Sequence, residues 1–439
     1  MTPPRMDAAP APLNLFQRLM LQWDRLHPYN AGQILKLAGP GDATAIETAW
    51  REALAAIDFG SCAPGVRHAP PGQSLSDFVS AELNRPFHDP REPPWRPFVY
   101  SQSDHHYVGI VYHHYAADSV SIRLLLREWF LRLYAPAEAR GVPLRNRGAP
   151  YGAFFGPRRA RWSVAKAMLS AVRWANRNRH IARVNYPNPD DFASRFIVHD
   201  LGDGLVPPLL EYARAHGATL NDLFLAVVAQ VCHRFVPLVF TSRRPDMALG
   251  TIVDLRPYAS QDLSETFGLY LGFTSVTCRP ADLDDFPRLL RAIAAQSRAD
   301  KEGRVALHSP VRMLAALAVG TVYSRPRLVE FYRKRVPLAG GISNINLNRD
   351  WPARFHPSPL LDYVRVSPTG PMMPLVFTPT TLGDHLHVGF TYRSNLIDDR
   401  RAKEMTRDFD ERLRALARTR RADAPAPGHA PSLDFPGGK

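Results

Sequence analysis

The chain has 439 residues, 45% hydrophobic and 22% charged, which is the composition of a globular protein long enough to bury a large core. No run of about 18 uninterrupted apolar residues is present, and residues 1–12 lack the apolar segment of a signal peptide, so we expect a cytoplasmic protein without a transmembrane helix. The net charge of +14 favours binding to nucleic acid, anionic membranes or acidic proteins. No nucleic-acid-binding motif is present to favour nucleic acid among these partners.

The first part of the chain alternates between helical and strand patterns. Apolar residues at helical spacing predict two helices, and short β-favouring runs predict three strands. In chain order these elements cover residues 13–26, 33–37, 42–56, 98–100 and 107–112. Residues 134–157 are rich in proline and glycine, so we expect them to cross the surface.

The best-defined stretch covers residues 107–130. Residues 107–112 predict a strand buried on both faces, and apolar residues recur at helical spacing from Ser119 onward. Residues 113–118 therefore form a loop that carries His113 and His114, with Asp118 or Ser119 as the N-cap of the helix. Two histidines and a carboxylate held between rigid elements suit a general base. The same pattern is found in ordinary polar residues that have no chemical role, and in half of a metal site.

A basic block follows at residues 157–184. Four apolar residues at helical spacing predict a helix, and the block contains no acidic residue. A solvated helix, a helix on an anionic membrane, and a docking surface for an acidic carrier protein or a cofactor phosphate all fit this pattern. Its cationic residues are Arg158, Arg159, Arg161, Lys166, Arg173, Arg177, Arg179 and Arg183.

Residues 186–189 read Tyr-Pro-Asn-Pro, which breaks regular structure, and we place a domain linker there. We expect an N-terminal half over residues 1–185, a C-terminal half over residues 190–421 and a disordered tail over residues 422–439. In the C-terminal half, the predicted strands cover residues 194–199, 248–253, 270–277, 341–346, 361–366, 373–378 and 386–392. The predicted helices cover residues 205–216, 220–235, 286–298, 311–319, 327–335 and 400–417.

The cysteines and the known cofactor motifs give no sign of a bound group. Cys62, Cys232 and Cys278 are far apart and form no C-x-x-C pair, so we expect reduced thiols and no metal site. A Walker A sequence, a glycine-rich dinucleotide fingerprint and a G-x-S-x-G elbow are all missing. We therefore expect no permanently bound cofactor.

The loop at residues 113–119, His-His-Tyr-Ala-Ala-Asp-Ser, resembles the HHxxxDG signature of the condensation-domain acyltransferase superfamily. That superfamily includes condensation domains of nonribosomal peptide synthetases, free-standing polyketide-associated acyltransferases and wax ester synthases. Ser119 stands where the family usually has glycine. Further resemblances follow the family's order at residues 83–87 with Pro94 and Arg96, at residues 219–225, at residues 250–256 and at residues 267–272.

The resemblance implies an α/β fold, a V-shaped pseudo-dimer of two chloramphenicol-acetyltransferase-like domains with the active-site tunnel between them. It implies that His114 is the general base or the group that orients the nucleophile. His113 would pack beneath His114 and fix the loop. Asp118 would be structural and would pair with Arg256 across the two halves, because a buried carboxylate needs a partner.

Other positions follow from the same resemblance. Asn344 and Asn346 lie where several relatives line the tunnel, and Ser119 adds a hydroxyl beside it, so these three residues are possible substrate contacts. Arg158, Arg159 and Arg161 are candidates for docking a carrier protein or a phosphate.

The implied activity is transfer of an acyl group from a thioester to an alcohol or amine, in secondary metabolism or lipid biosynthesis. The donor would be the phosphopantetheine thioester of an acyl or peptidyl carrier protein, or acyl-coenzyme A, and the acceptor a small molecule. The chain has no adenylation, carrier or thioesterase domain, so we expect a separate, monomeric enzyme without a nucleic-acid partner. Two alternatives stay open: a membrane-associated enzyme of wax-ester type, with weak contact to anionic membranes, and a non-catalytic docking module.

Overall fold

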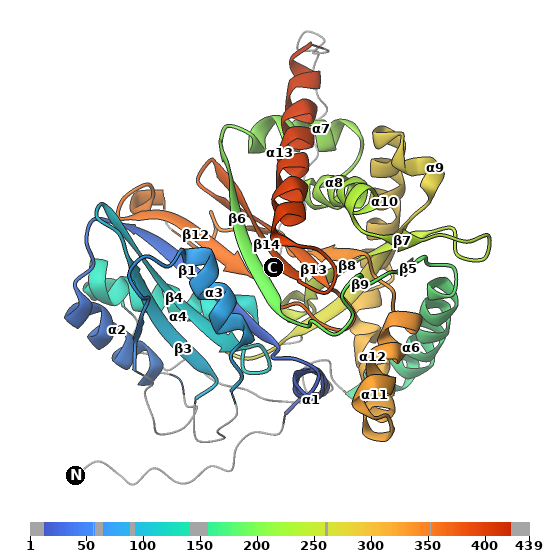
Figure 1. The fold of residues 1–439 in the computed structure, drawn as a ribbon, viewed down its shortest axis with the longest axis horizontal. Helices are drawn as coiled ribbons and strands as arrows, with labels where there is room; N and C mark the ends of the chain where they lie inside the picture. Colours follow the sequence, from blue (N-terminus) through green and yellow to red (C-terminus); the bar gives the residue numbers. More distant parts are fainter. Residues whose placement is uncertain are drawn as a thin grey trace.

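The computed structural model describes residues 13–55, 57, 65–87, 93–139, 157–259, 262–351 and 353–422, but not the side chains of residues 157–165 and 420–422. Two mixed β-sheets lie side by side, and helices cover their faces (Figure 1). The α/β class expected from the alternating patterns is confirmed.

The first sheet has five strands in the order β12-β1-β4-β3-β2. They are β1 (Asn30–Ala38), β2 (Arg67–His68), β3 (Trp95–Ser101), β4 (His105–His113) and β12 (Leu360–Val366). Side chains alternate across a strand, so the sheet buries two apolar faces. Leu35 packs on the side covered by α2 (Ala43–Ala55) and α4 (Ser119–Tyr134), whereas Ile34 packs on the side of α3 (Leu75–Asn84).

The second sheet has seven strands, six of them in the order β6-β14-β13-β10-β8-β9, with β11 also paired to β13. They are β6 (Ser194–Asp203), β8 (Met247–Asp254), β9 (Leu271–Cys278), β10 (Gly340–Ile342), β11 (Ile345–Asn346), β13 (Leu375–Leu382) and β14 (His385–Arg393). A short separate pair joins β5 (Arg183–Val184) to β7 (Leu238–Val239).

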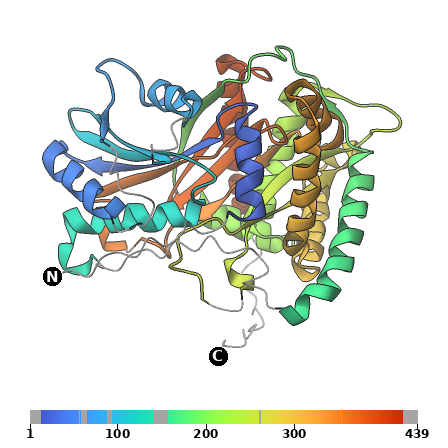
Figure 2. The same cartoon turned by 90° about the horizontal axis from the view of Figure 1, so that it is seen from below.

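Helices cover both faces of the second sheet. One face carries α7 (Val206–Ala215), α8 (Leu220–Phe235), α10 (Phe286–Glu302) and α13 (Asp399–Ala422), with the short α9 (Pro280–Leu283) beside them. The other carries α1 (Leu15–Asp24), α6 (Pro157–Asn178), α11 (Ser309–Val322) and α12 (Arg325–Arg335). From below, α1 in blue lies between the first sheet and this helical group (Figure 2). Short 3₁₀ turns cover Pro136–Glu138, Arg256–Tyr258, Val305–His308 and Ala353–Phe355.

The chain crosses between the two sheets late in the sequence. Strand β12, predicted at residues 361–366, pairs antiparallel with β1 of the first sheet, with Ile34 opposite Val364. The first sheet is therefore not built from residues 1–185 alone. The halves at 1–185 and 190–421 stay a prediction, and the tail at 422–439 lies almost entirely outside the described residues.

The helical stretch Val305–Val322 is long and apolar enough to cross a membrane by length and composition, and 28% of it is buried. No such stretch was expected from the sequence, because Arg312 interrupts the apolar run. The described cysteines, Cys232 and Cys278, are free and buried, and burial raises the pKa of Cys278 to about 12. Cys62 lies outside the described residues.

Candidate active site

A cavity of about 320 Å³ lies between the two sheets, lined by residues of both. The first sheet contributes Gln33 of β1 and Arg365 of β12, and the second contributes Asp254 of β8. The loop after β4 contributes His114, and α4 contributes Ser119 at its first turn. Concave sites of this size that gather polar groups from several elements are the usual place for ligands.

His114 faces this cavity and is only 8% exposed. Its ring stacks on Tyr29 at a centroid distance of 6.0 Å and meets the edge of Tyr112 at 5.7 Å. Its backbone N–H donates to the Tyr29 carbonyl over 3.0 Å, which holds the loop against β1. Burial lowers the pKa of His114 to about 4, so the imidazole is neutral and able to accept a proton at pH 7.

His113 does not line the cavity. Its Nδ1 accepts a hydrogen bond from the Tyr115 backbone N–H at 3.2 Å, and its Nε2 lies 3.1 Å from Asp24 Oδ1. With 2% of its surface exposed, it ties the loop to the end of α1. This geometry fits the expected role of fixing the loop that carries His114.

Asp118 is the N-cap of α4 and is completely buried. Arg256 donates to it through both Nη atoms, and the backbone N–H groups of Ser121 and Tyr270 donate to it at 3.0 and 2.9 Å. Burial alone would raise the pKa of Asp118, but the ion pair with Arg256 and these hydrogen bonds hold it below its ordinary value. The guanidinium also lies 4.6 Å from the Tyr270 ring. The pair joins α4 to the segment after β8.

Ser119 lines the cavity next to His114. The Gln33 amide donates to its carbonyl and to its Oγ, each over 3.0 Å. The Oγ therefore accepts from Gln33 and keeps its own proton to donate, which a glycine at this position could not do. Gln33 also accepts a hydrogen bond from the Tyr363 hydroxyl, so its amide orientation is fixed.

The two asparagines near β11 differ. Asn344 lines the cavity, as expected of a substrate contact. Asn346 does not line it. It is exposed, and its Oδ1 accepts from the Asn348 backbone N–H at 2.9 Å. The strand ends at this point and the side chain caps the following turn, so its expected contact with substrate stays a prediction.

Two buried arginines in the cavity wall were not predicted from the sequence. Arg365 is 4% exposed and donates to the carbonyl and Oγ of Ser343 at 2.8 and 2.7 Å. It forms no ion pair within the described residues, and its Nε has no hydrogen-bond partner there. Arg123, 8% exposed, has Asp350 3.1 Å from its Nε. Burial and the neighbouring Arg123 lower the pKa of Arg365 to about 10, so it stays cationic at pH 7.

The sequence did not predict that several other polar residues line the cavity. Asp254 lines the wall, and burial raises its pKa. The only local signal for Asp254 was its position two residues before Arg256 in the segment 250–256 that carries the resemblance. Nothing in the sequence singles out Gln33, Arg123 or Arg365, because they reach the cavity from three separate elements.

The basic block forms α6, as predicted. The backbone of Arg158, Arg159 and Arg161 belongs to this helix, but their side chains lie outside the described part of the chain. Arg177 turns inward and donates to Ser275 Oγ at 2.7 Å. The exposed cations on the described turns of the helix include Lys166 and Arg173.

Comparison with known proteins gives related chains and a common fold. The condensation-domain family model matches residues 66–308. A plipastatin synthase subunit of Bacillus subtilis (strain 168) is 22% identical over 227 residues, 50% of this chain. This chain spans only 9% of the length of that curated relative.

Two solved structures show the fold. The X-domain from teicoplanin biosynthesis is 20% identical, with a TM-score of 0.58 over 95% of this chain and 96% of that chain. The trichothecene 15-O-acetyltransferase TRI3 from Fusarium sporotrichioides is 12% identical, with a TM-score of 0.66 over 93% of this chain and 94% of that chain.

Proposed function

The chain belongs to the condensation-domain family, and from this premise we propose that it is an acyltransferase that moves an acyl group from a thioester to an alcohol or amine. The observation that carries the proposal is the neutral, buried His114 in a cavity lined by both sheets. Asp118 and Arg256 hold its loop from the opposite half, so the histidine is fixed before substrate arrives. Fixed geometry of this kind favours direct attack between two bound substrates.

The reaction needs no covalent enzyme intermediate. The acceptor oxygen or nitrogen attacks the thioester carbonyl, and its proton moves to His114 as the new bond forms. The tetrahedral intermediate then collapses, the C–S bond breaks, and the protonated His114 returns its proton to the departing thiolate, which leaves the histidine neutral again. A histidine of pKa about 4 is a weak base, but the attacking O–H or N–H becomes acidic as the bond forms. Ser119 and Asn344 line the same cavity and carry hydrogen-bond donors for the oxyanion.

We also propose that one substrate carries a carboxylate or another anionic group. Arg365 is a buried cation without an acidic partner among the described residues, and leaving such a charge unpaired is costly. Arg123 lies in the same wall and adds positive charge. An anionic group between them would satisfy the free N–H groups and compensate the charge.

For the donor we favour a phosphopantetheine thioester on a carrier protein over acyl-coenzyme A. The relative from Bacillus subtilis is part of plipastatin synthase, and the net charge of +14 suits an acidic carrier. Both donor forms present the same thioester to the cavity.

A membrane-associated enzyme is the second candidate, favoured by exposed apolar side chains on two neighbouring helices. On α6 these are Met168, Leu169 and Val172, and on α11 they are Leu314 and Val322, which is 79% exposed. A basic helix with an exposed apolar face binds anionic bilayers. A non-catalytic docking module also stays open, because the X-domain is solved in complex with OxyB.

The test is product formation. The protein is incubated with acyl thioesters on carrier protein, on coenzyme A and on a short pantetheine, each with acceptors that differ only in a carboxylate. Mass spectrometry then identifies esters or amides, and His114→Ala is the negative control. A docking module would give no product with any pair, whereas the proposed enzyme gives product that His114→Ala abolishes.

A further inference from the structure

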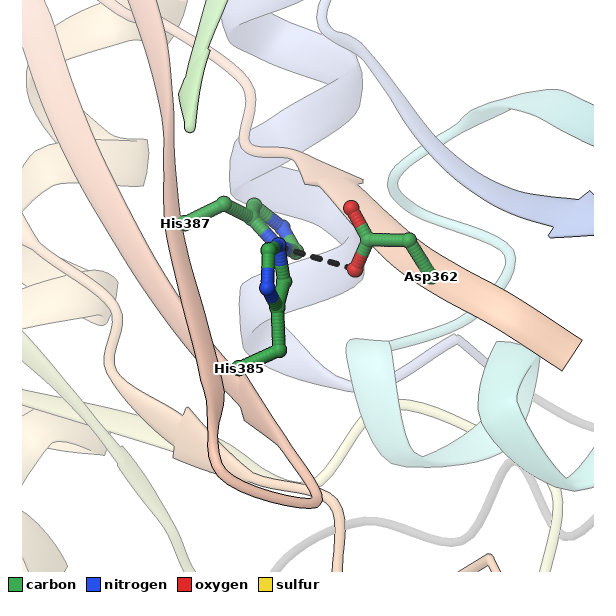
Figure 3. A group of neighbouring side chains, drawn as sticks. All are labelled: Asp362, His385 and His387. Carbon is green, nitrogen blue, oxygen red and sulfur yellow. Dashed lines mark ion pairs between the residues drawn. The ribbon is translucent and has the colours of Figure 1, made fainter. Parts of the chain in front are cut away.

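A second cluster of polar side chains lies away from the cavity, where β12 passes β14 (Figure 3). His385 and His387 are two residues apart on β14 and therefore share one face of the strand. Asp362 on β12 points toward them, and one ligand atom from each of the three lies within 4.8 Å of the others. The lining of the His114 cavity does not include this cluster.

His387 gives the first sign of a ligand. It is 1% exposed, its Nδ1 lies 3.0 Å from Asp362 Oδ1, and neither this nitrogen nor Nε2 has a hydrogen-bond partner within the described residues. A buried polar atom without a partner costs about 1–3 kcal/mol. Most buried polar atoms are satisfied by protein, water or an ion, so this imidazole calls for a partner.

His385 gives the second sign. Its Nδ1 lies 2.8 Å from Asp203 Oδ1, and its Nε2 lies 3.3 Å from Asp200 Oδ1. A histidine that binds a metal usually donates its other ring N–H to a carboxylate, which fixes the tautomer and makes the free nitrogen more basic. With Nδ1–H donated to Asp203, Nε2 is the nitrogen available to a metal ion.

We propose that Asp362, His385 and His387 bind a divalent zinc ion. Two imidazoles and one carboxylate suit zinc, whereas calcium and magnesium prefer oxygen ligands throughout. Tetrahedral zinc with bonds of about 2.0–2.2 Å places its ligand atoms roughly 3.3 Å apart. This spacing is close to the 3.0 Å between His387 Nδ1 and Asp362 Oδ1. Three protein ligands leave one position for water or another donor.

The site joins the two sheets. Asp362 lies on the edge strand of the first sheet and both histidines lie on β14 of the second. The carboxylates of Asp200 and Asp203 are 73% and 76% exposed beside His385, so an acidic surface leads to the site. Bound zinc would cross-link β12 to β14, so its expected effect is on stability. The inference does not depend on the proposed transferase activity.

The test uses full-length, tag-free protein stripped with a chelator, dialysed against Zn²⁺ and analysed for metal by mass spectrometry, with affinity from calorimetric titration. We expect one zinc ion per chain and a higher melting temperature with Zn²⁺ than with chelator. His385→Gln should weaken binding at least about tenfold, and Asp203→Asn, at an exposed position, should weaken it about 10–100-fold. Co²⁺ in place of zinc should give the strong visible absorption of a tetrahedral site.

The chain offers a matched control in His105. Its Nδ1 also lies 2.8 Å from a carboxylate, that of Asp104, and its side chain is 18% exposed, against 19% for His385. His105→Gln should bind zinc like the wild type. Equal weakening by His105→Gln and His385→Gln, or less than one zinc ion per wild-type chain, would overturn the proposal. If His385→Gln does not fold, the proposal would be overturned by unchanged zinc affinity in Asp203→Asn together with the weak Co²⁺ spectrum of an octahedral site.

Discussion

Arg256 and Asp118, which are 138 positions apart in the sequence, form a bidentate ion pair. Its Nη1–Oδ2 and Nη2–Oδ1 distances are 2.7 and 3.0 Å. Both residues are buried, so each neutralises a charge that the protein interior would otherwise leave unpaired. The pair fixes the loop of His114 from the other half of the chain. In the proposed transferase, activity and stability therefore depend on the same contact.

The first prediction follows from this pair. Asp118→Ala and Arg256→Ala should each lower the free energy of unfolding by about 3–5 kcal/mol, because each leaves a buried charge alone. The double variant should be less harmful than the sum of the two. Denaturant unfolding measures all three, with Arg400→Ala of the exposed Arg400–Glu404 pair as a control that changes stability by less than about 1 kcal/mol. Strict additivity would mean that the pair contributes no coupling.

The second prediction concerns the pH dependence of activity. The pH profile of kcat/KM reports the ionisation of the free enzyme, and His114 has to be neutral to accept a proton. Because burial lowers its pKa to about 4, the rate should stay level through about pH 6.5 and fall only as the pH approaches 4. A drop centred near pH 6.5 would contradict the buried geometry.

Two variants separate the roles of the paired histidines. His114→Ala should lower kcat by about 10²–10⁴-fold while thermal unfolding stays cooperative. His113→Ala should lower both the melting temperature and the rate, because His113 ties the loop to Asp24 and Tyr115. Near wild-type turnover in His114→Ala at saturating substrate would remove it from the mechanism.

The loop could be predicted from sequence because its signals are local. A buried strand, an N-capped helix and the residues between them lie within 24 consecutive positions, 107–130. Helix α3 was missed although Ser74 caps it and Asp77 follows three residues later, a start signal that the sequence contains. The placement of β12 in the first sheet could not be predicted, since strand pairing across hundreds of residues has no local signature. The same reason hid Arg365, which lies on that strand.

The fourth prediction tests the anionic substrate. Arg365→Met keeps much of the side-chain volume and removes the charge, so KM for an acceptor or donor bearing a carboxylate should rise about 10–100-fold, the value of one charge-assisted hydrogen bond. The matched substrate without the carboxylate should be unaffected. An equal loss for both substrates would assign Arg365 a structural role.

Stability gives an independent readout of the same variant. Removing a buried cation that has no acidic partner should leave the melting temperature unchanged or raise it. The control is Arg96→Met, which removes a buried arginine whose Nε lies 2.9 Å from Glu82, and it should lower the melting temperature. A similar loss of stability in both variants would mean that an acidic group outside the described residues already compensates Arg365.

The fifth prediction concerns the surface of α6, where charged and apolar side chains are both exposed. Two triple variants separate their roles. One replaces the charges at Lys166, Arg173 and Arg179, the last directly after the end of the helix, with serine. The other replaces the apolar residues Met168, Leu169 and Val172 with serine. If α6 receives an acidic carrier protein, the charge variant should raise KM for a carrier-bound donor, because long-range attraction raises the association rate. The kcat for a short pantetheine thioester should stay unchanged in it, because that donor has no docking surface.

Salt and liposomes decide between the partners. The Debye length falls from about 10 Å at 0.1 M salt to about 3 Å at 1 M, so high salt should raise the wild-type KM toward that of the charge variant. A membrane enzyme would behave differently: the apolar variant would lose flotation with anionic liposomes, because exposed Leu169 and its neighbours would no longer enter the bilayer, while the kinetics with carrier-bound donor would be kept. If both variants match the wild type in both assays, α6 is a solvated basic helix, and carrier docking must be sought on another face.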